Sequence, residues 1–470
     1  MAQPTAFLGS KALLAVQGPE PSFVATGYAF PPLLVYGSAL VRSPVTVQVL
    51  CGAVLVGTIV RTMGRLEVAR FWQILWSALL LLHPALGLML LRDPTWVATT
   101  LLLLITTRLL WQILYPQDLP LNFLVVLVGL SASGLMLLRF EAWWGLVFIL
   151  ITLWCLLWQE TWQYRAAALF IVGTMCLFAI GTCVYLNWLA TGNPLAFLSQ
   201  PGSGIRLPGL DSFLVQAGLG ESILKILRWM LQIAPVYLLV MLWLMGRTQA
   251  PLQVGLIIAL PIVLLLINLW EGLYTPNLSQ FGVYLALLPL LLEQLPSRQS
   301  WRKLLITLGL VLSLVSSGWV LQTNQVIPDE ILLWRQLTHQ ALPELQPVQA
   351  YHQMTIEQRT IATYLFQMGQ PQQHILMDDR LHFPILYLLH HTEGLILPHQ
   401  YEFEVALEEP EQWVNLIVVA GAQSPLRMQD AVRRPLAQQR NIDPEAQEGL
   451  TLPGFKTVFD FPNYQVLQRL

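Results

Sequence analysis

Long apolar runs separated by short polar segments fill the chain from about residue 44 to residue 321. A helix needs roughly 20 mostly apolar residues to cross the hydrocarbon core of a bilayer. The pattern therefore predicts an α-helical polytopic membrane protein with about ten transmembrane helices. Residues 1–43 are predicted to form an interfacial segment at the outer face. The predicted spans lie near residues 44–61, 70–91, 94–115, 119–138, 142–158, 165–188, 223–245, 251–270, 281–296 and 301–321.

The apolar runs stop after about residue 322, where charged residues, glutamine and turn signals become frequent. We therefore predict a soluble C-terminal α/β domain over residues 322–470. The runs Ile375–Met377 and Val414–Ala420 are typical of buried strands. Strands that alternate with helices indicate a small open sheet with helices packed against it.

Two further elements of this domain follow from local signals. The stretch "TIEQRTIATYLFQMG" predicts a helix with Thr355 as N-cap and Gly369 as its stop. The last residues, "GFKTVFDFPNYQVLQRL", predict a closing hairpin whose turn contains Asn463.

The composition agrees with a membrane protein. Of the 470 residues, 55% are hydrophobic and 11% are charged, and the mean hydropathy is +0.58, whereas a soluble domain carries about 25% charged residues. The net charge of −2 excludes the electrostatic footprint of a nucleic-acid-binding protein. The cysteines lie inside apolar runs without metal-ligand spacing and are interpreted as packing residues: Cys51, Cys155, Cys176 and Cys183.

The distribution of lysine and arginine predicts the orientation, because cytoplasmic loops retain these residues. The loops that carry them are 62–70, 159–165, 246–250 and 297–303, and we predict that they are cytoplasmic. The alternate loops and the C-terminal domain then lie on the extracytoplasmic side of the inner (plasma) membrane.

One predicted outer loop, residues 190–222, is unusually long and rich in Gly, Pro and Asn. It combines turn residues with apolar residues suited to the membrane interface, and Arg206, Lys225 and Arg228 lie in or near it. A polar loop of this kind at the membrane interface suits an enzyme that binds a lipid-linked phosphate, because the phosphate headgroup lies in water while the lipid chain lies in the bilayer. An extracytoplasmic linker without chemistry is an equally good interpretation of the loop alone.

Three acids are placed near the outer face: Glu20, Asp93 and Glu141. Ionisable residues at membrane depth are costly and therefore mark candidate functional sites. Arg92 stands beside Asp93 and Arg139 stands two residues before Glu141, which favours neutralised pairs near helix ends. The functional alternative is a general base for an acceptor hydroxyl, or a ligand to a divalent metal such as Mg²⁺ or Mn²⁺.

Prolines mark two further positions. Tyr28 precedes the pair Pro31 and Pro32, which predicts an extended segment before a short helix at the outer interface. His83 stands before Pro84 inside an apolar run. We interpret it as a helix-packing hydrogen-bond partner at a kink rather than as a metal ligand.

Short stretches along the chain match a known family pattern in the same order. "YAFPPLLVY" is similar to an aromatic-Pro-Pro-Leu segment, and "LLRFEAWW" to Leu-x-Arg-Tyr-Glu-Gly/Ala-Trp, with Phe140 replacing Tyr. "NWLATGNPLAF" is similar to the more specific Asn-Trp-Leu-x-x-Gly-Asp/Asn-Pro-Leu-x-Phe loop. "HILMDDRLHFPILYL" and "GLTLPGFKTVFDFPNYQVLQR" resemble parts of an outer α/β domain. The chain thus resembles the GT-C superfamily of polytopic membrane glycosyltransferases, especially bacterial protein O-mannosyltransferase-like and aminoarabinose transferase-like members.

This resemblance implies inverting transfer of a sugar from a polyprenyl-phosphate carrier to an acceptor at the outer face of the inner membrane. Family members place an acid on the first outer loop, and Glu20 takes that role here by position. They usually begin with a full transmembrane helix, whereas "AFLGSKALLAVQG" is too short, so a truncated start or a lost first helix is expected. They also tend to carry Arg-Tyr where this chain has Val283 and Tyr284.

The site hypothesis makes Glu20 the general base, with Asp93 and Glu141 as further catalytic candidates. The predicted partners are a polyprenyl-phosphate sugar and membrane lipid. A non-catalytic envelope protein that uses the same scaffold to bind a partner or lipid is the rival hypothesis. The substrate-binding candidates share an outer-face position and a polar or cationic side chain: Tyr28, Arg92, Asn193, Arg206, Lys225 and Arg228.

Overall fold

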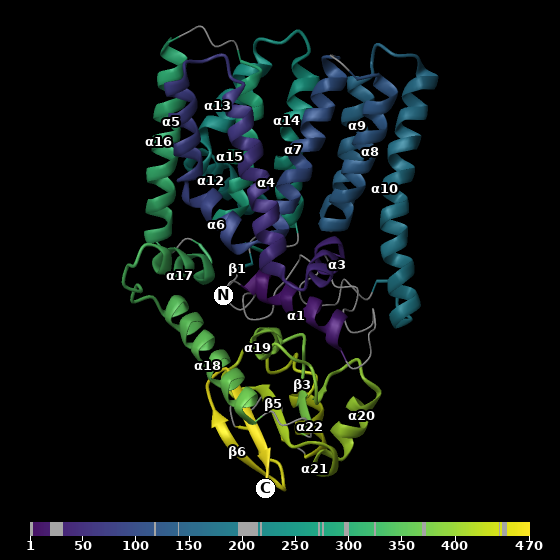
Figure 1. Cartoon of the computed structure of the whole chain (residues 1–470), viewed down its shortest axis with the longest axis vertical. Coiled ribbons are helices and arrows are strands. Elements are labelled where there is room, and N and C mark those ends of the chain that lie inside the picture. The colour runs from purple at the N-terminus through teal and green to yellow at the C-terminus, as the bar shows by residue number, and fades with distance from the viewer. Residues whose placement is uncertain are drawn as a thin grey trace.

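The computed structural model describes residues 3–18, 32–116, 119–139, 141–195, 215–216, 219–270, 273–274, 277–295, 300–323, 326–368, 373–440, 442–443 and 449–470. A long bundle of helices stands on an α/β part that is formed by the end of the chain (Figure 1). We call residues 326–470 the tail, and the end of the bundle beside them the tail end.

Five helices in the described part of the chain are long and apolar enough to cross a membrane, and two bent pairs raise the number to seven if each pair is one span. The chain is therefore a helical membrane protein. The long helices are α4 (Pro44–Gly64), α7 (Pro94–Leu114), α8 (Leu121–Leu138), α10 (Trp162–Thr191) and α16 (Ser300–Gln322). The bent pairs are α5 (Arg70–Leu81) with α6 (Pro84–Arg92), at 56°, and α12 (Leu219–Ile233) with α13 (Pro235–Met245), at 101°.

The predicted count of ten spans is not confirmed, although all ten predicted stretches are largely helical where they are described. Three of them contain shorter apolar stretches of 10–17 residues, and a fourth helix of this kind precedes α4. The three are α9 (Glu141–Leu156), α14 (Pro251–Trp270) and α15 (Leu278–Glu293), and the fourth is α3 (Pro32–Val41).

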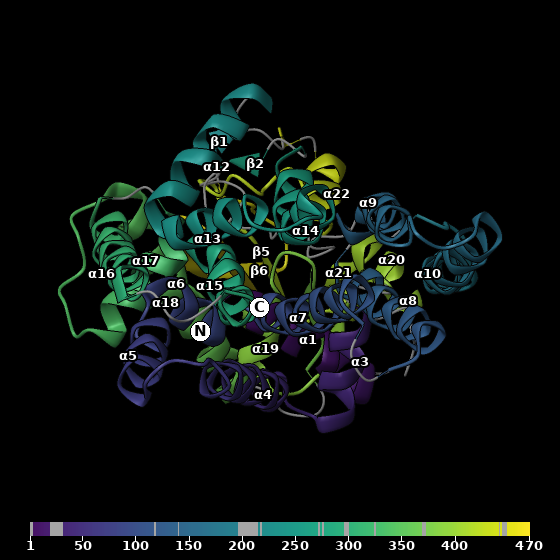
Figure 2. The ribbon, with the colours of Figure 1, turned by 90° about the horizontal axis from the view of Figure 1, so that it is seen from above.

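Helix α15 shows why apolar length alone overestimates the spans. It is buried along nearly its whole length and lies near the middle of the bundle when seen from above (Figure 2). Its apolar side chains therefore contact protein. Helix α10 lies at the edge in the same view, where Phe170 and Phe178 are about three-quarters exposed while Val172 and Cys176 are fully buried. An apolar run has the same composition whether it faces lipid or the protein core.

The bend between α5 and α6 is built around His83 and Pro84. Proline lacks a backbone N–H and favours the first turn of a new helix. The His83 Nδ1 accepts a hydrogen bond from the Ala85 N–H at 3.2 Å, and its Nε2 lies 2.9 Å from the Ser313 Oγ of α16. The predicted packing role of His83 is confirmed.

The described residues of the tail form a five-stranded sheet in the order β4-β3-β5-β7-β6. Strands β4, β3 and β5 are parallel, and β7 and β6 continue the sheet antiparallel. The predicted small open sheet and the closing hairpin are confirmed. The strands are β3 (Ile375–Met377), β4 (Leu395–Ile396), β5 (Leu416–Ala420), β6 (Phe455–Asp460) and β7 (Tyr464–Arg469), and β1 (Val215–Gln216) pairs with β2 (Leu273–Tyr274) elsewhere.

Alternate strand residues face opposite helical layers. Leu416 and Val418 pack with α18 (Gln346–Met368) and α19 (Phe383–Leu389), whereas Ile417 and Val419 pack with α20 (Tyr401–Glu408) and α22 (Arg433–Gln439). This alternation follows from the two-residue period of a strand. Two more helices complete the tail: α17 (Pro328–Leu337) and α21 (Pro410–Trp413).

One predicted boundary in the tail is wrong. Helix α18 begins at Gln346 rather than near Thr355. The Thr355 hydroxyl donates to the Tyr351 carbonyl at 3.0 Å, which is a bond within the helix rather than a cap. Threonine makes both kinds of local bond, so its presence did not identify the helix start. Gly369, the predicted stop, lies outside the described residues.

Helix α1 (Gln3–Gln17) lies between the bundle and the tail (Figure 1). Phe7 meets Phe383 of α19 edge to face, with ring centroids 5.5 Å apart. A Cβ on Gly9 would overlap the ring of Tyr387, so the absence of a side chain at this position allows the close approach. Residues 3–17 thus form a buried wedge between the two parts.

We expect Gly282→Ala to destabilise the bundle, because the new Cβ would lie 2.9 Å from the Ala85 carbonyl oxygen of α6. Overpacking of this kind costs about 1–3 kcal/mol. The control is Gly173→Ala on α10, where nothing lies within 4 Å and helix propensity favours alanine. Thermal unfolding in detergent should show a lower Tm for the first variant only. Equal Tm values would contradict the close α6–α15 packing.

Candidate functional site

The most concentrated group of charges described at the tail end surrounds Arg92, the last residue of α6. Its Nε donates to the Asp329 Oδ2 at 2.8 Å, and its Nη1 lies 3.8 Å from the Glu330 Oε1. The same Nη1 donates to the Ser279 Oγ at 3.3 Å. The Tyr351 hydroxyl completes the group by donating to the Asp329 Oδ1 at 3.3 Å. We call these five residues the Arg92 cluster.

The N-terminus of helix α15 carries a partial positive charge and is the second positive partner of Glu330, after Arg92. The Glu330 carboxylate accepts hydrogen bonds from the backbone N–H groups of Leu278 at 2.7 Å and Ser279 at 2.9 Å. These groups begin α15, where free N–H donors and the helix dipole favour an anion. Burial raises the pKa of Glu330, and Arg92 and the two amides oppose that rise.

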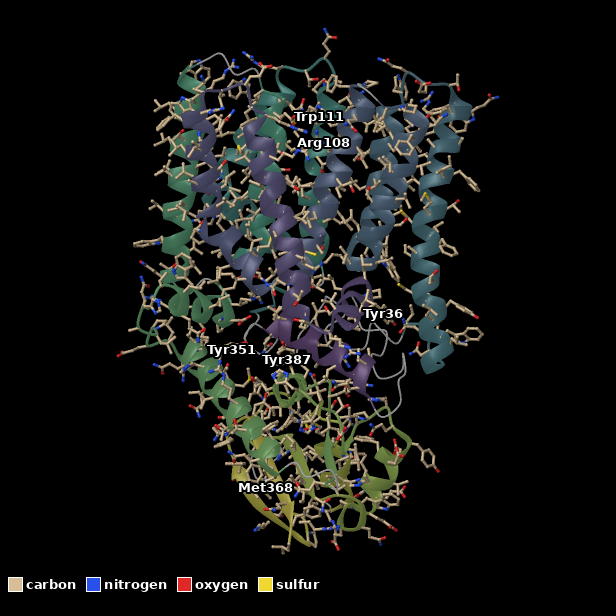
Figure 3. The ribbon with its side chains drawn as sticks, viewed as in Figure 1. Tyr36, Arg108, Trp111, Tyr351, Met368 and Tyr387 are labelled. Carbon is tan, nitrogen blue, oxygen red and sulfur yellow. The ribbon has the colours of Figure 1, made fainter. Side chains whose placement is uncertain are left out.

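All five members of the Arg92 cluster are buried. Arg92 and Ser279 of the bundle form hydrogen bonds and ion pairs with Asp329 and Glu330 of the tail. Figure 3 shows Tyr351 at this junction, near Tyr387 of α19, whereas Trp111 lies toward the far end of the bundle. The described cluster is therefore a joint between the two parts, and it offers no exposed cation to a ligand.

A second buried ion pair fixes α1 to the tail. The Lys11 Nζ donates to the Asp379 Oδ2 at 2.7 Å, and both side chains are about 5% exposed. Burial acts to raise the pKa of Asp379, but Lys11 and His399 outweigh it and hold the pKa below its ordinary value. The carboxylate is therefore kept charged inside the protein.

Asp93 and Arg139 have local partners at the tail end. The Asp93 Oδ1 accepts from the N–H groups of Thr95 at 3.0 Å and Trp96 at 3.2 Å, and so it caps α7. The Arg139 guanidinium lies over the Trp96 ring at 4.3 Å. Glu141 begins α9, and its side chain lies outside what the structure describes.

Two of the predicted substrate-binding residues are described and exposed. The Asn193 Oδ1 accepts from the Leu195 N–H at 3.0 Å, in a turn that follows Gly192 with φ of 70°. Asn193 thus fixes the turn after α10. Arg228 lies on α12 beside exposed Leu224, Leu227 and Leu231, an arrangement that suits the edge of a membrane.

Glu20, Tyr28 and Arg206 lie outside the described residues, as does the side chain of Lys225. The described part of the chain therefore brings Arg92 and Asp93 together only as neighbours at a helix junction. The roles assigned to all of these residues stay predictions.

Sequence reasoning missed the two main partners of Arg92. Asp329 and Glu330 follow Pro328 at the start of α17, and acids in the first turn of a helix are common because they complement its dipole. This local pattern gave no sign that both carboxylates contact a residue more than 200 positions earlier. The periodic pattern of apolar and polar residues does not reveal these two carboxylates either, because an ion pair between distant residues does not recur at a fixed spacing along the chain.

Val283 and Tyr284, which stand where members of the resembled family tend to carry Arg-Tyr, lie inside the bundle. Tyr284 is buried in α15, where its hydroxyl donates to the Pro261 carbonyl at 3.3 Å and its ring lies 5.1 Å from that of Tyr237. No group of three or more His, Cys, Asp or Glu residues that could hold a metal ion occurs within the described ranges. The metal hypothesis stays a prediction.

These features define a polytopic membrane protein with an α/β domain joined to one end of its helical bundle. No protein-family model matches the sequence, and no curated protein matches it. A similar solved structure is ArnT from Cupriavidus metallidurans, bound to undecaprenyl phosphate. The match has a TM-score of 0.57 at 11% identity, and it covers 99% of this chain and 93% of that chain. At this identity the match shows the fold alone, which agrees with the predicted GT-C-like fold and does not show that the chain shares the role of any particular member.

We expect Arg92→Gln to destabilise the protein by about 3–5 kcal/mol, because removing one partner of a buried ionic group leaves the other charges uncompensated. Arg228→Gln is the matched control, since Arg228 is exposed. Thermal unfolding in detergent micelles measures both. If the two variants unfold at the same temperature, the Arg92 cluster does not join the bundle to the tail.

We expect Lys11→Met to release α1 from the tail, because Asp379 would remain buried without its cation. The double variant Lys11→Met with Asp379→Leu should restore docking, since apolar residues can replace both members of a buried pair. Exposed Lys456→Met serves as the control. Limited digestion with a nonspecific protease should cut residues 3–17 in the first variant only. Cleavage of both Lys11 variants at the same rate would contradict the role of the pair.

The Lys11–Asp379 pair also predicts acid sensitivity. Because the pKa of Asp379 lies below its ordinary value in the folded protein, the pair contributes stability above about pH 4 and loses it as pH falls through the folded pKa. The same digestion should therefore show α1 becoming accessible on acidification. The double variant, which lacks the carboxylate, should lose this particular pH dependence.

Proposed function

We propose that the chain transfers a sugar from a polyprenyl-phosphate-linked donor to an acceptor at the outer face of the inner membrane. The observation that carries the proposal is the fold match over 99% of the chain to a protein whose structure contains undecaprenyl phosphate. The match includes the tail as well as the bundle. In this proposal the tail lies outside the cytoplasm.

The residues at the tail end suit a lipid-linked substrate. Arg228 on α12 combines a cation with exposed leucines on the same short helix, and Asn193 fixes the turn that ends α10. A polyprenyl chain would lie along apolar surface while its phosphate meets cations. We assign Arg206, Lys225 and Arg228 to the phosphate, and Tyr28 to the walls of the same site.

The proposed reaction is a single inverting displacement. The Glu20 carboxylate takes the proton from an acceptor hydroxyl while that oxygen forms a bond to the anomeric carbon. The bond from that carbon to the phosphate oxygen breaks, and its electron pair leaves with polyprenyl phosphate. Cations stabilise the charge that develops on the leaving phosphate, and a bound Mg²⁺ or Mn²⁺ would supply the same stabilisation.

Arg92 and Asp93 take a positioning role in this proposal. Arg92 fixes the end of α6 to the tail, and Asp93 caps α7 directly beyond it. Together they hold the outer ends of two helices. Glu141, at the start of α9, is the second acid that we retain as a catalytic candidate.

We expect Glu20→Gln to abolish sugar transfer while leaving donor binding intact. The assay uses purified protein in liposomes with a panel of radiolabelled polyprenyl-phosphate sugars and candidate acceptors. Glu160→Gln is the control, because Glu160 is an exposed acid in a loop predicted to be cytoplasmic. Arg206→Gln and Lys225→Gln should weaken binding of polyprenyl phosphate. Unchanged turnover in Glu20→Gln would remove Glu20 from the mechanism.

One observation favours a second candidate, a non-catalytic envelope protein that binds a lipid or a partner. Arg92, a cation at the tail end, is buried and contacts Asp329, Glu330 and Ser279 inside the protein. In this candidate the scaffold holds the lipid but lacks the groups that carry out transfer. Saturable binding of polyprenyl phosphate with no transfer of any sugar in the panel would support this candidate.

A further inference from the structure

The tail contains a cavity that the proposed transfer does not use. Its volume is about 470 Å³, which lies in the range of about 300–1,000 Å³ typical of small-molecule sites. Helix α18, the segments after β3 and β5, and the β6–β7 turn form its walls. The polar residues that line it are Gln353, His382, Gln423, Ser424, Asn463 and Tyr464.

The topology of the sheet explains the position of the cavity. Strands β4 and β5 lie on opposite sides of β3 and run parallel to it. The segments that leave the carboxyl ends of β3 and β5 therefore diverge and open a crevice, which is the usual ligand site of an open α/β sheet. His382 follows β3, and Gln423 and Ser424 follow β5.

The carboxylates nearest the cavity, Asp430 and Asp378, accept backbone hydrogen bonds within the tail, and Asp430 also lies beside His382. Asp430 accepts hydrogen bonds from the N–H groups of Ala420 at 2.5 Å and Val432 at 2.9 Å. Asp378 accepts from the N–H groups of Arg380 at 2.9 Å and Ala431 at 3.0 Å. Among the described residues, no Asp, Glu, Lys or Arg lines the cavity.

His382 adds an unused hydrogen-bonding group to this wall. It is 1% exposed, and its Nε2 lies 3.4 Å from the Asp430 Oδ2. Its Nδ1 has no hydrogen-bond partner within the described part of the protein. Buried polar atoms are normally paired, and a ligand hydroxyl is a group that would pair with this nitrogen.

We propose that this cavity binds a neutral carbohydrate. Amide and hydroxyl side chains both donate and accept hydrogen bonds, as sugar hydroxyls require. Met354, Leu381 and Pro462 add apolar surface for the C–H faces of a sugar ring. A charged ligand would lose its hydration in the cavity without gaining an opposite charge. The inference depends on the cavity alone and stands whether or not the chain transfers sugar.

The cavity lies close to the junction with the bundle. Its lining residues Ala350 and Met354 flank Tyr351 on α18, and the Tyr351 hydroxyl donates to Asp329 of the Arg92 cluster. Figure 3 shows Tyr351 at the boundary between the tail and the bundle. A carbohydrate in the cavity would therefore be held on the same side of the bundle as the proposed transfer site.

The test measures saccharide binding to the full chain without any lipid-linked donor. The protein is kept in a detergent that has no sugar headgroup, since such headgroups would compete. Ligand-observed saturation-transfer NMR is titrated with glucose, maltose and N-acetylglucosamine, and with glucose 6-phosphate and glucuronate as charged comparators. Saturable binding of a neutral sugar, at least about tenfold tighter than its charged comparators, is expected. Absence of saturable neutral-sugar binding, or tighter binding of the charged sugars, overturns the proposal.

Side-chain variants locate the bound sugar. Gln353 and Gln423 are exposed at the cavity wall, so Gln353→Leu and Gln423→Leu should preserve folding while weakening binding about three- to tenfold each. Gln412→Leu, an exposed position on α21 away from the cavity lining, is the matched control and should bind as the unaltered chain does. Glu20→Gln should also bind normally, which separates this site from the transfer site. Equal binding by the cavity variants and the control overturns the location.

Discussion

The buried charge of Arg92 is the constraint on which the arrangement of the two parts depends. A guanidinium removed from water is costly unless its charge and its donors are all matched. Asp329 and Glu330 of the tail supply the charge, and Ser279 at the start of α15 supplies a further acceptor. Because Glu330 also caps α15, any other docking of the tail would leave an ion and a helix end unsatisfied.

The N-terminal wedge adds a second buried ion pair between the N-terminal part of the chain and the tail. Helix α1 pairs Lys11 with Asp379 and packs Phe7 against Phe383. Asp379 is the second residue after β3, close to the segment that places His382 at the tail cavity. The junction therefore connects the membrane helices, the wedge and the sheet. Side chains at the tail end are fixed in place by these buried contacts and not only by the connecting loops.

The likeness to ArnT at 11% identity shows that very different sequences can form a similar membrane scaffold. Apolar helices tolerate exchange among Leu, Ile, Val and Phe, since volume and pattern matter more than identity. Function depends on particular side chains instead. Here Arg92 serves the joint between bundle and tail, and Tyr284 lies buried beside Tyr237 inside the bundle. The phosphate site that we propose uses other cations, Arg206, Lys225 and Arg228.

The sequence by itself determined the positions of the apolar helices, the strands around Ile375–Met377 and Val414–Ala420, the closing hairpin and the packing role of His83. These features depend on local periodicity and on proline, which act over a few residues. Only the tertiary structure decided that α15 faces protein, that Thr355 lies inside its helix, and that Arg92 pairs with the tail. An apolar helix face has the same residue pattern whether it contacts lipid or the protein core. An ion pair between segments that are distant in the sequence leaves no local signal.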